Sequence, residues 1–431
     1  MAFRFIHTAD LHLDSPLKAL RRRNADLADA VGVATRTAFE RIVERAIEDT
    51  VDALLIAGDL YDGTTRDVST GLYLADCIRR LGAAGVHTLI VLGNHDAESV
   101  IKPPFASVDH LTVFKPKAGT VRFEEVQVAI HGASFRDSQV PDDMVSGYPE
   151  PVPGWVNIGL LHTSLGGYAG HAAYAPTTPA RLTDKGYDYW GLGHVHKSQV
   201  VQEGREDRSW IVYPGIPQGR DMGETGPGRA VLGSVEDGRV AIEWFDVGPV
   251  VLERVPVRLP DAASIDDVRL EVRTIAEAVI GAAGPEQSII RPELEVPAFL
   301  VPALHRVRDE LLDLVQTNVL ARAGRISVEK IGLVAAGEAR DSVEGHNETL
   351  MELTGLVRDH AAGDADLVAE IARDLDGVLS KLPADVRREP ELDTPLTSLE
   401  PDRGGDVGAW LETAVREAAA AIAGTGGEER P

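Results

Sequence analysis

The sequence predicts an α/β fold joined to a smaller β/α unit and an acidic helical segment. Three observations support this: short apolar runs alternate with helix-like segments in the first half of the chain, most of these runs end in Gly, Asp, Asn or His, and helix-like segments are absent from Trp210 to Asp246. Short apolar runs of this kind are typical of buried strands whose carboxyl ends bring polar side chains to one edge of a sheet.

Residues 1–250 open with a predicted β-α-β unit. A strand is expected over residues 3–7, a helix over Thr35–Glu48 and a strand over Ala53–Ala57. One helix and four strands continue the alternation: Val68–Leu81, then Val86–Leu92, Val126–His131, Val156–His162 and Tyr187–Leu192. From Trp210 to Asp246, strand-like runs separated by glycine-rich turns predict an antiparallel second part.

Residues 251–335 predict a smaller α/β unit that could form a separate lobe. Its expected elements are strand Leu252–Leu259, helix Ser264–Ile280, strand Ser288–Val296, helix Val301–Val315 and strand Ile326–Leu333. Residues 336–431 shift to Ala, Asp and Glu and predict an acidic extension. Helices are expected near Glu348–Val357, Ala365–Lys381 and Val407–Ala423.

Composition limits the classes of partner. The 431 residues carry 43 basic and 68 acidic side chains, a formal charge of -25. A protein this acidic is not held on nucleic acid or anionic lipid by its overall field, so any such contact must be local. The single cysteine, Cys77, excludes disulfides within the chain and cysteine-based zinc sites. The sequence shows neither a signal peptide nor an apolar run long enough to span a membrane, so a cytoplasmic protein is expected.

Five polar clusters follow apolar runs. They are Asp10-Leu11-His12, Gly58-Asp59, Gly93-Asn94-His95-Asp96, Leu161-His162 and Gly193-His194-Val195-His196. Each alone is weak, because a single histidine after a strand is more often a hydrogen-bonded structural residue. Together they supply oxygen and imidazole donors and no thiolate.

That donor set has a specific chemistry. Seven side chains are candidate metal ligands: Asp10, His12, Asp59, Asn94, His162, His194 and His196. Such donors suit manganese, iron or zinc, and a site with two ions about 3.5 to 4 Å apart needs several ligands for each ion and a shared carboxylate. Glycines before Asp59, Asn94 and His194 allow the backbone to turn sharply at the strand end, where a Cβ atom would crowd the ions.

The ordered motifs HTADLHLDSP, AGDLYD, VLGNHD and GLGHVHK resemble the calcineurin-like metallophosphoesterase superfamily. Within it they look like the SbcD-type and YhaO-type DNA repair exonucleases, relatives of the nuclease subunit of double-strand-break repair complexes. The resemblance covers roughly residues 3–235. It implies a four-layer α-β-β-α domain with a cap domain, two divalent metal ions, DNA as substrate and a coiled-coil ATPase as partner, and it leaves a homodimer open.

The resemblance also implies roles for single residues. Asp10, His12, Asp59 and His196 would hold one ion, with Asp59 bridging, and the second ion would be held by Asn94, His162 and His194. His95 is similar to the family's catalytic histidine. Two departures stand out: Asp62 occupies a position where some relatives carry a second histidine, and Ile216 and Asp221 alter the loop after Tyr213-Pro214-Gly215.

Two other functions compete with a DNA exonuclease. One is a phosphatase or phosphodiesterase for small molecules or cyclic nucleotides, against which the LHLDSP element and the length of chain beyond the catalytic part both argue. The other is a DNA-end-binding scaffold with a vestigial metal site, and the intact set of seven donors argues against it.

Overall fold

The computed structural model describes residues 2–15, 25–62, 68–98, 109–137, 140, 142–166, 175–205, 208–284 and 286–336. The chain divides after Ala336, and Met1–Ala336 form one compact unit. The helices expected beyond residue 336 therefore lie outside the described residues. Within the described part of the chain, no helix is both long enough and apolar enough to cross a membrane.

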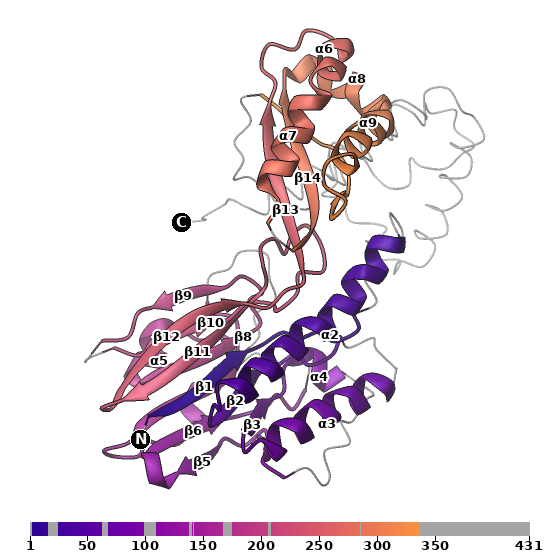
Figure 1. The fold of residues 1–431 in the computed structure, drawn as a ribbon. Helices are drawn as coiled ribbons and strands as arrows, with labels where there is room; N and C mark the ends of the chain where they lie inside the picture. Colours follow the sequence, from indigo (N-terminus) through magenta and orange to yellow (C-terminus); the bar gives the residue numbers. More distant parts are fainter. Residues whose placement is uncertain are drawn as a thin grey trace, which may run out of the picture. The chain divides into compact units, whose positions relative to one another are not determined.

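Two six-stranded sheets form the centre of the N-terminal part (Figure 1). The first has the strand order β12-β11-β1-β2-β3-β4, with β1–β4 parallel and a β11–β12 hairpin added antiparallel to β1. In chain order its strands are β1 (Phe3–Thr8), β2 (Ala53–Ala57), β3 (His87–Val91), β4 (Leu111–Val113), β11 (Arg229–Glu236) and β12 (Arg239–Asp246). This sheet confirms the predicted β-α-β opening and the antiparallel part after Trp210.

The second sheet has the order β5-β6-β7-β8-β10-β9. Its strands are β5 (Gly119–Phe123), β6 (Val128–Gly132), β7 (Val156–His162), β8 (Tyr189–Gly193), β9 (Gln199–Gln202) and β10 (Trp210–Tyr213). The four inner strands are parallel, and the edge strands β5 and β9 pair antiparallel. The carboxyl ends of β7 and β8 therefore lie at the same edge of the sheet.

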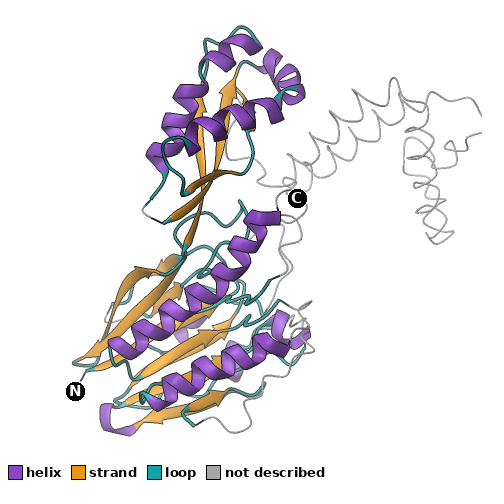
Figure 2. Cartoon of the chain, turned by 45° about the vertical axis from the view of Figure 1, so that its right-hand side comes forward, coloured by secondary structure: helices purple, strands orange, loops and turns teal. Residues whose placement is uncertain are grey.

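Alternation of side chains along β1 shows how the layers stack. Phe3 and Phe5 pack between the two sheets, whereas Ile6 faces the helical layer. That layer consists of α2 (Ala25–Glu48) and α3 (Val68–Ala83), which lie along one face of the first sheet (Figure 2). Successive residues of a strand point to opposite faces, so one strand contributes to two cores.

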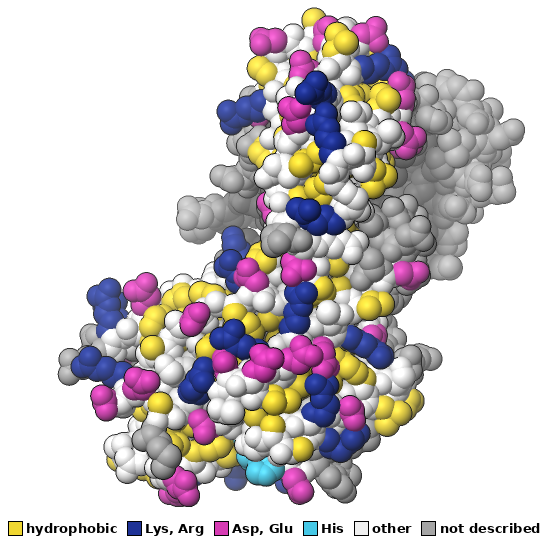
Figure 3. Space-filling model, in the orientation of Figure 1, with side chains coloured by type: hydrophobic (Ala, Val, Ile, Leu, Met, Phe, Trp, Pro, Cys, Tyr) yellow, Lys and Arg dark blue, Asp and Glu magenta, His cyan; other side chains and the backbone are white. Residues whose placement is uncertain are grey.

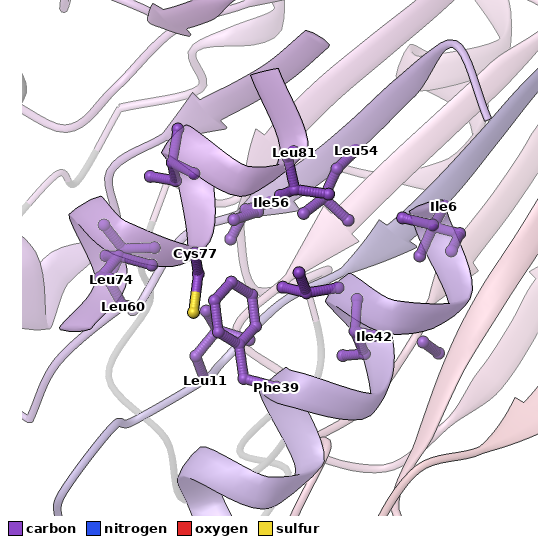
Figure 4. Packing of buried hydrophobic residues seen from close by; sticks show 14 of the residues in the cluster. Ile6, Leu11, Phe39, Ile42, Leu54, Ile56, Leu60, Leu74, Cys77 and Leu81 are labelled. Carbon is purple, nitrogen blue, oxygen red and sulfur yellow. The ribbon is translucent and has the colours of Figure 1, made fainter. Parts of the chain in front are cut away.

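The core under the two helices is mostly aliphatic and aromatic and includes one thiol (Figure 4). Cys77 of α3 lies among the side chains of Phe39 and Leu74, and burial raises its pKa to about 11. A thiol with so high a pKa is inert at neutral pH, and Cys77 is a packing residue.

The outer face of the second sheet has its own helical cover. Leu182 of α5 (Pro179–Asp184) is buried against Leu161, Leu192 and Ile211. The order of layers is thus helix, sheet, sheet, helix, which confirms the predicted four-layer α-β-β-α arrangement.

A third, smaller sheet follows and has a separate apolar core. It contains β13 (Val250–Arg258), β14 (Gln287–Val296), β15 (Ile326–Val328) and β16 (Gly332–Ala335), all parallel. Four helices connect them: α6 (Ile265–Leu270), α7 (Val272–Ala282), α8 (Val301–Arg306) and α9 (Arg308–Leu320). A boundary between domains near residue 250 remains a proposal.

The structure differs from the sequence prediction at several boundaries. Helix α2 begins at Ala25 rather than Thr35, because Ala28 and Val31 of its first turns pack against Leu252 and make the extra length favourable. The strand expected over Ile326–Leu333 is interrupted where Glu329 turns inward to pair with Arg291, 2.9 Å from Nε to Oε2. The edge strands β4 and β5 were not predicted.

Candidate metal centre

Five strands bring the predicted ligands to one place. Asp10 and His12 follow β1, Asp59 follows β2 and Asn94 follows β3, while His162 ends β7 and His194 and His196 follow β8. These strands belong to both central sheets, and all of them deliver their polar residues at the carboxyl end. The site therefore lies where the carboxyl ends of the two parallel strand sets meet.

The loops after β1 and β2 run side by side. Backbone hydrogen bonds join Asp10 N to Gly58 O at 2.9 Å and His12 N to Asp59 O at 3.1 Å. In both loops the carboxylates and His12 adopt a left-handed backbone, with φ of 52° at Asp10, 40° at His12 and 53° at Asp59. Left-handed backbone at non-glycine residues is uncommon and clusters at functional sites, where the surrounding structure enforces it.

The glycines of the motifs are sterically required. A Cβ atom on Gly93 would overlap Asp59 Oδ1 and lie 2.9 Å from His162 Nε2, and a Cβ atom on Gly58 would overlap the His162 ring. A Cβ atom at either position would therefore displace candidate ligands.

His162 is oriented as a ligand would be. Its Nδ1 lies 2.9 Å from the carbonyl oxygen of Ala57, so Nδ1 is the nitrogen that carries the proton. Its Nε2 then directs a lone pair toward Asn94 Oδ1 at 3.0 Å and Asp59 Oδ2 at 3.4 Å. Three electron-rich atoms that face one another in a buried site fit a cation between them.

His196 shows the same pattern on the other side of the site. Its Nδ1 lies 2.6 Å from Glu224 Oε1, and its Nε2 lies 3.3 Å from Nε2 of His12. Burial first, and then the positive charge of Arg220, lower the pKa of His12 well below its ordinary value. A neutral imidazole is the form that binds a metal ion.

Two buried carboxyl groups in the centre have raised pKa values. Burial raises the pKa of Asp10 to about 6, although the imidazoles of His196 and His162 lower it. Burial and the Asp59 carboxylate also raise the pKa of Asp96 to about 7. Burial and mutual repulsion make it costly for these carboxyl groups to be ionised together. A bound cation would stabilise their ionised forms, so the donor set fits divalent metal ions.

Three groups of three residues within the centre could each hold an ion. The first is Asp10, His12 and His196, the second is Asp10, Asp59 and His162, and the third is His12, Asp62 and His95. Asn94 joins the second group through its contact with His162. The backbone N–H of His194 donates to both oxygens of Asp10 at 3.0 Å, and the His194 ring packs edge-on against the His162 ring. All seven predicted residues thus lie in one cluster, His194 through its backbone N–H and its ring packing and the other six through side-chain donor atoms. Which ion each would bind remains a proposal.

His95 lies at the rim. Its ring packs edge-on against His12, its backbone N–H donates to Asp59 Oδ1 at 3.1 Å, and 36% of its side chain is exposed. Its Nδ1 lies 3.5 Å from Oδ1 of Asp62, which also accepts a hydrogen bond from Ser15. His95 is thus accessible to an incoming substrate while it touches two candidate ligands, and it is more exposed than His196, of which 28% of the side chain is exposed.

Four further residues belong to the site and received no role from the sequence. They are Asp62, Asp96, Arg220 and Glu224. Asp96 accepts hydrogen bonds from the N–H groups of Leu60 and Gly93 and so ties the loop after β2 to the turn after β3. Asp96 directly follows His95 and Asp62 ends the motif AGDLYD, so both had a local signal. Glu224 lies in a loop whose altered sequence put any role of that loop in doubt.

Comparison with known proteins agrees with this geometry. Residues 3–198 match the family of calcineurin-like phosphoesterases. The chain carries a calcineurin-like metallophosphoesterase domain. This family consists of hydrolases that use divalent metal ions, in accord with the clusters described above.

Alignments with individual relatives extend beyond the residues that match the family. The chain is 28% identical over 316 residues to the uncharacterized metallophosphoesterase YhaO of Bacillus subtilis, an alignment that covers 72% of this chain and 77% of YhaO. It is 30% identical over 232 residues to the DNA double-strand break repair protein Mre11 of Methanopyrus kandleri, covering 50% of this chain and 49% of that protein. It is 26% identical to Mre11 of Haloferax volcanii, covering 67% of this chain and 66% of that protein.

Proposed function

We propose that this protein is a two-metal phosphodiesterase that acts as a DNA exonuclease in DNA repair. The observation that carries the proposal is the convergence of seven oxygen and imidazole donors from five strand ends. One ion cannot use seven donors, and manganese is the first candidate because no thiolate biases the site toward softer metals.

In the proposed arrangement Asp10, His12, Asp59 and His196 hold one ion, Asn94, His162 and His194 hold the other, and Asp59 bridges. Two bound ions would supply Lewis-acid stabilisation of a phosphoryl oxygen and lower the pKa of a water nucleophile. The buried ligands are held by backbone contacts, as between His162 and the Ala57 carbonyl, so little reorganisation accompanies binding.

His95 is the proposed catalytic residue. Its half-exposed ring lies between the ligand His12 and the carboxylate of Asp62. A positioned imidazole there can donate a proton to the leaving oxygen of the phosphodiester or stabilise negative charge in the transition state. Asp62 would hold the ring in the orientation that this transfer needs.

DNA is favoured as the substrate by similarity to proteins named for double-strand break repair and by the LHLDSP element after the first ligands. The charge of the protein limits how it could hold DNA. On the face shown in Figure 3, basic and acidic side chains of the described residues are interspersed, without a continuous basic stripe. Together with the formal charge of -25, this means that DNA would be gripped locally or through a partner such as a coiled-coil ATPase.

The test compares two substrates. Purified protein is incubated with end-labelled DNA and with bis-p-nitrophenyl phosphate, in manganese, in magnesium and in chelator. We expect metal-dependent release of nucleotides from DNA ends, which an Asp59→Ala variant purified in the same way lacks. Hydrolysis of the small diester with no attack on DNA would instead support a small-molecule phosphodiesterase. Binding of DNA ends without hydrolysis of either substrate would support a scaffold.

A further inference from the structure

The loop between β10 and β11 carries two charged residues that reach the metal centre. Glu224 Oε1 lies 2.6 Å from His196 Nδ1, on the opposite side of the ring from the nitrogen that faces His12. Only 11% of the Glu224 side chain is exposed. A carboxylate that is this buried needs a compensating partner, and it has two.

The second partner is Arg220. Its guanidinium donates from Nη2 to Glu224 Oε1 at 2.7 Å, and its backbone N–H donates to Oε2 at 2.7 Å. Both oxygens of Glu224 are thus held, which leaves the carboxylate one orientation. The same guanidinium lies 3.9 Å from Asp62 Oδ2. Arg220 therefore lies between two carboxylates, that of Glu224 next to His196 and that of Asp62 next to His95.

The loop itself is fixed from its other side. Gln218 is buried and exchanges hydrogen bonds with both the N–H and the carbonyl of Val250. Met222 is buried beside Leu252, and its carbonyl accepts from Arg254 Nε at 2.9 Å. These contacts with β13 rule out a mobile surface ion pair, and they place the Arg220–Glu224 pair rigidly behind His196.

We propose that Glu224 and Arg220 are positioning residues for the metal centre. Glu224 accepts the Nδ1 proton of His196 and so directs the Nε2 lone pair toward Asp10 and His12, while Arg220 fixes Glu224. A carboxylate behind a ligating histidine sets its tautomer and raises its basicity. The inference rests on the proposed role of His196 as a metal ligand, and it assigns a function to a loop whose role the departures at Ile216 and Asp221 put in doubt.

The experiment measures manganese binding to the full chain by electron paramagnetic resonance of the free ion during titration. Wild type is expected to bind two ions. Glu224→Ala should weaken one of the two by about 10- to 100-fold, the usual effect of removing such a partner, and leave the other unchanged. Glu224→Gln retains an acceptor for the Nδ1 proton and should recover part of the loss, whereas Glu224→Asp withdraws the carboxylate by one methylene and should recover less.

Two further variants separate positioning from general stability. Glu310→Ala removes a carboxylate that pairs with Arg269, 2.8 Å from Nη2, on helices that do not contact the loop, and should bind both ions as wild type does. Arg220→Lys loses the forked geometry and should weaken the same ion as Glu224→Ala by a smaller factor.

The outcomes are distinct. Wild type that binds fewer than two ions contradicts the proposed function itself. Wild type that binds two while Glu224→Gln and Glu224→Ala also bind both normally overturns the positioning role alone. A loss spread equally over both ions and accompanied by a lower melting temperature would show that the loop is only structural, which also overturns it.

Discussion

The Nδ1 atom of His95 lies 3.5 Å from Oδ1 of Asp62, a residue on a different strand end. Asp62 is held in turn by the Ser15 hydroxyl, which donates to its other oxygen at 2.8 Å. The imidazole that is open to substrate is therefore backed by a carboxylate whose own orientation is fixed. This arrangement supports the proposal that Asp62 orients the His95 ring for proton transfer.

His95→Ala should leave the metal content nearly unchanged and reduce hydrolysis by about a hundredfold or more, the usual range for a positioned acid-base group. Asp59→Ala should lose metal and activity together, because a bridging carboxylate serves both ions. Metal analysis beside steady-state kinetics distinguishes the two. If both variants retained metal equally, the division of roles between His95 and Asp59 would be wrong.

Asp62→Asn should reduce kcat by about tenfold, less than His95→Ala does, because Asp62 acts through His95. The double variant Asp62→Asn/His95→Ala should be no slower than His95→Ala alone, since residues that act as a unit are not additive. Metal content should remain at the wild-type value. A loss of metal in Asp62→Asn would make Asp62 a ligand, as its place in a cluster with His12 and His95 would allow.

Gly93→Ala should abolish metal binding and activity together. The new methyl group would overlap Asp59 Oδ1 and crowd His162 Nε2. Because the turn is buried and closely packed, the methyl group can be accommodated only by displacing these ligands. Gly147→Ala is the matched control, because a Cβ atom there meets nothing within 4 Å. Metal analysis of both folded variants checks the prediction, and normal metal content in Gly93→Ala would contradict the crowding argument.

Residues 338–431 lie outside the described residues, and their charge alone supports a prediction. They carry 9 basic and 22 acidic side chains, a net charge of -13, so the segment should repel the DNA backbone. A chain that ends at residue 337 should keep its metal and its basal nuclease activity, bind DNA at least as well at low salt, and lose association with a coiled-coil ATPase.

The rival interpretation of that segment is that its helices pack onto the rest of the chain. The truncated protein would then melt at a lower temperature or become insoluble, which differential scanning calorimetry detects. A truncated protein that is as stable as the full chain and still binds the ATPase would exclude both roles.

The parts of the fold that could be predicted are those with the strongest local signals. Strands Ala53–Ala57 and Val156–His162 have the predicted bounds, because buried parallel strands are continuous apolar runs closed by polar residues. The edge strand Gly119–Phe123 was missed because none of its five residues is buried and it lacks such a run. The early start of α2 depends on tertiary contacts with Leu252, which no local pattern contains.

The residues of the candidate site also fall into those that local motifs predict and those that depend on tertiary contacts. Its donors could be predicted because each follows an apolar strand in a recognisable motif. Glu224 and Arg220 could not, because their role depends on a loop folding back against His196, 28 residues away in sequence for Glu224. The left-handed backbone of Asp10 and Asp59 was equally unpredictable, since it is imposed by hydrogen bonds between two loops rather than by residue type.

The most direct test of the central claim is the number of metal ions per chain. Protein reconstituted with excess manganese and freed of unbound metal should contain close to two ions by elemental analysis. His196→Ala and His162→Ala should each retain about one, because they belong to different proposed ion sites. A reproducible value of one ion per chain in wild-type protein with full activity would contradict the two-metal account.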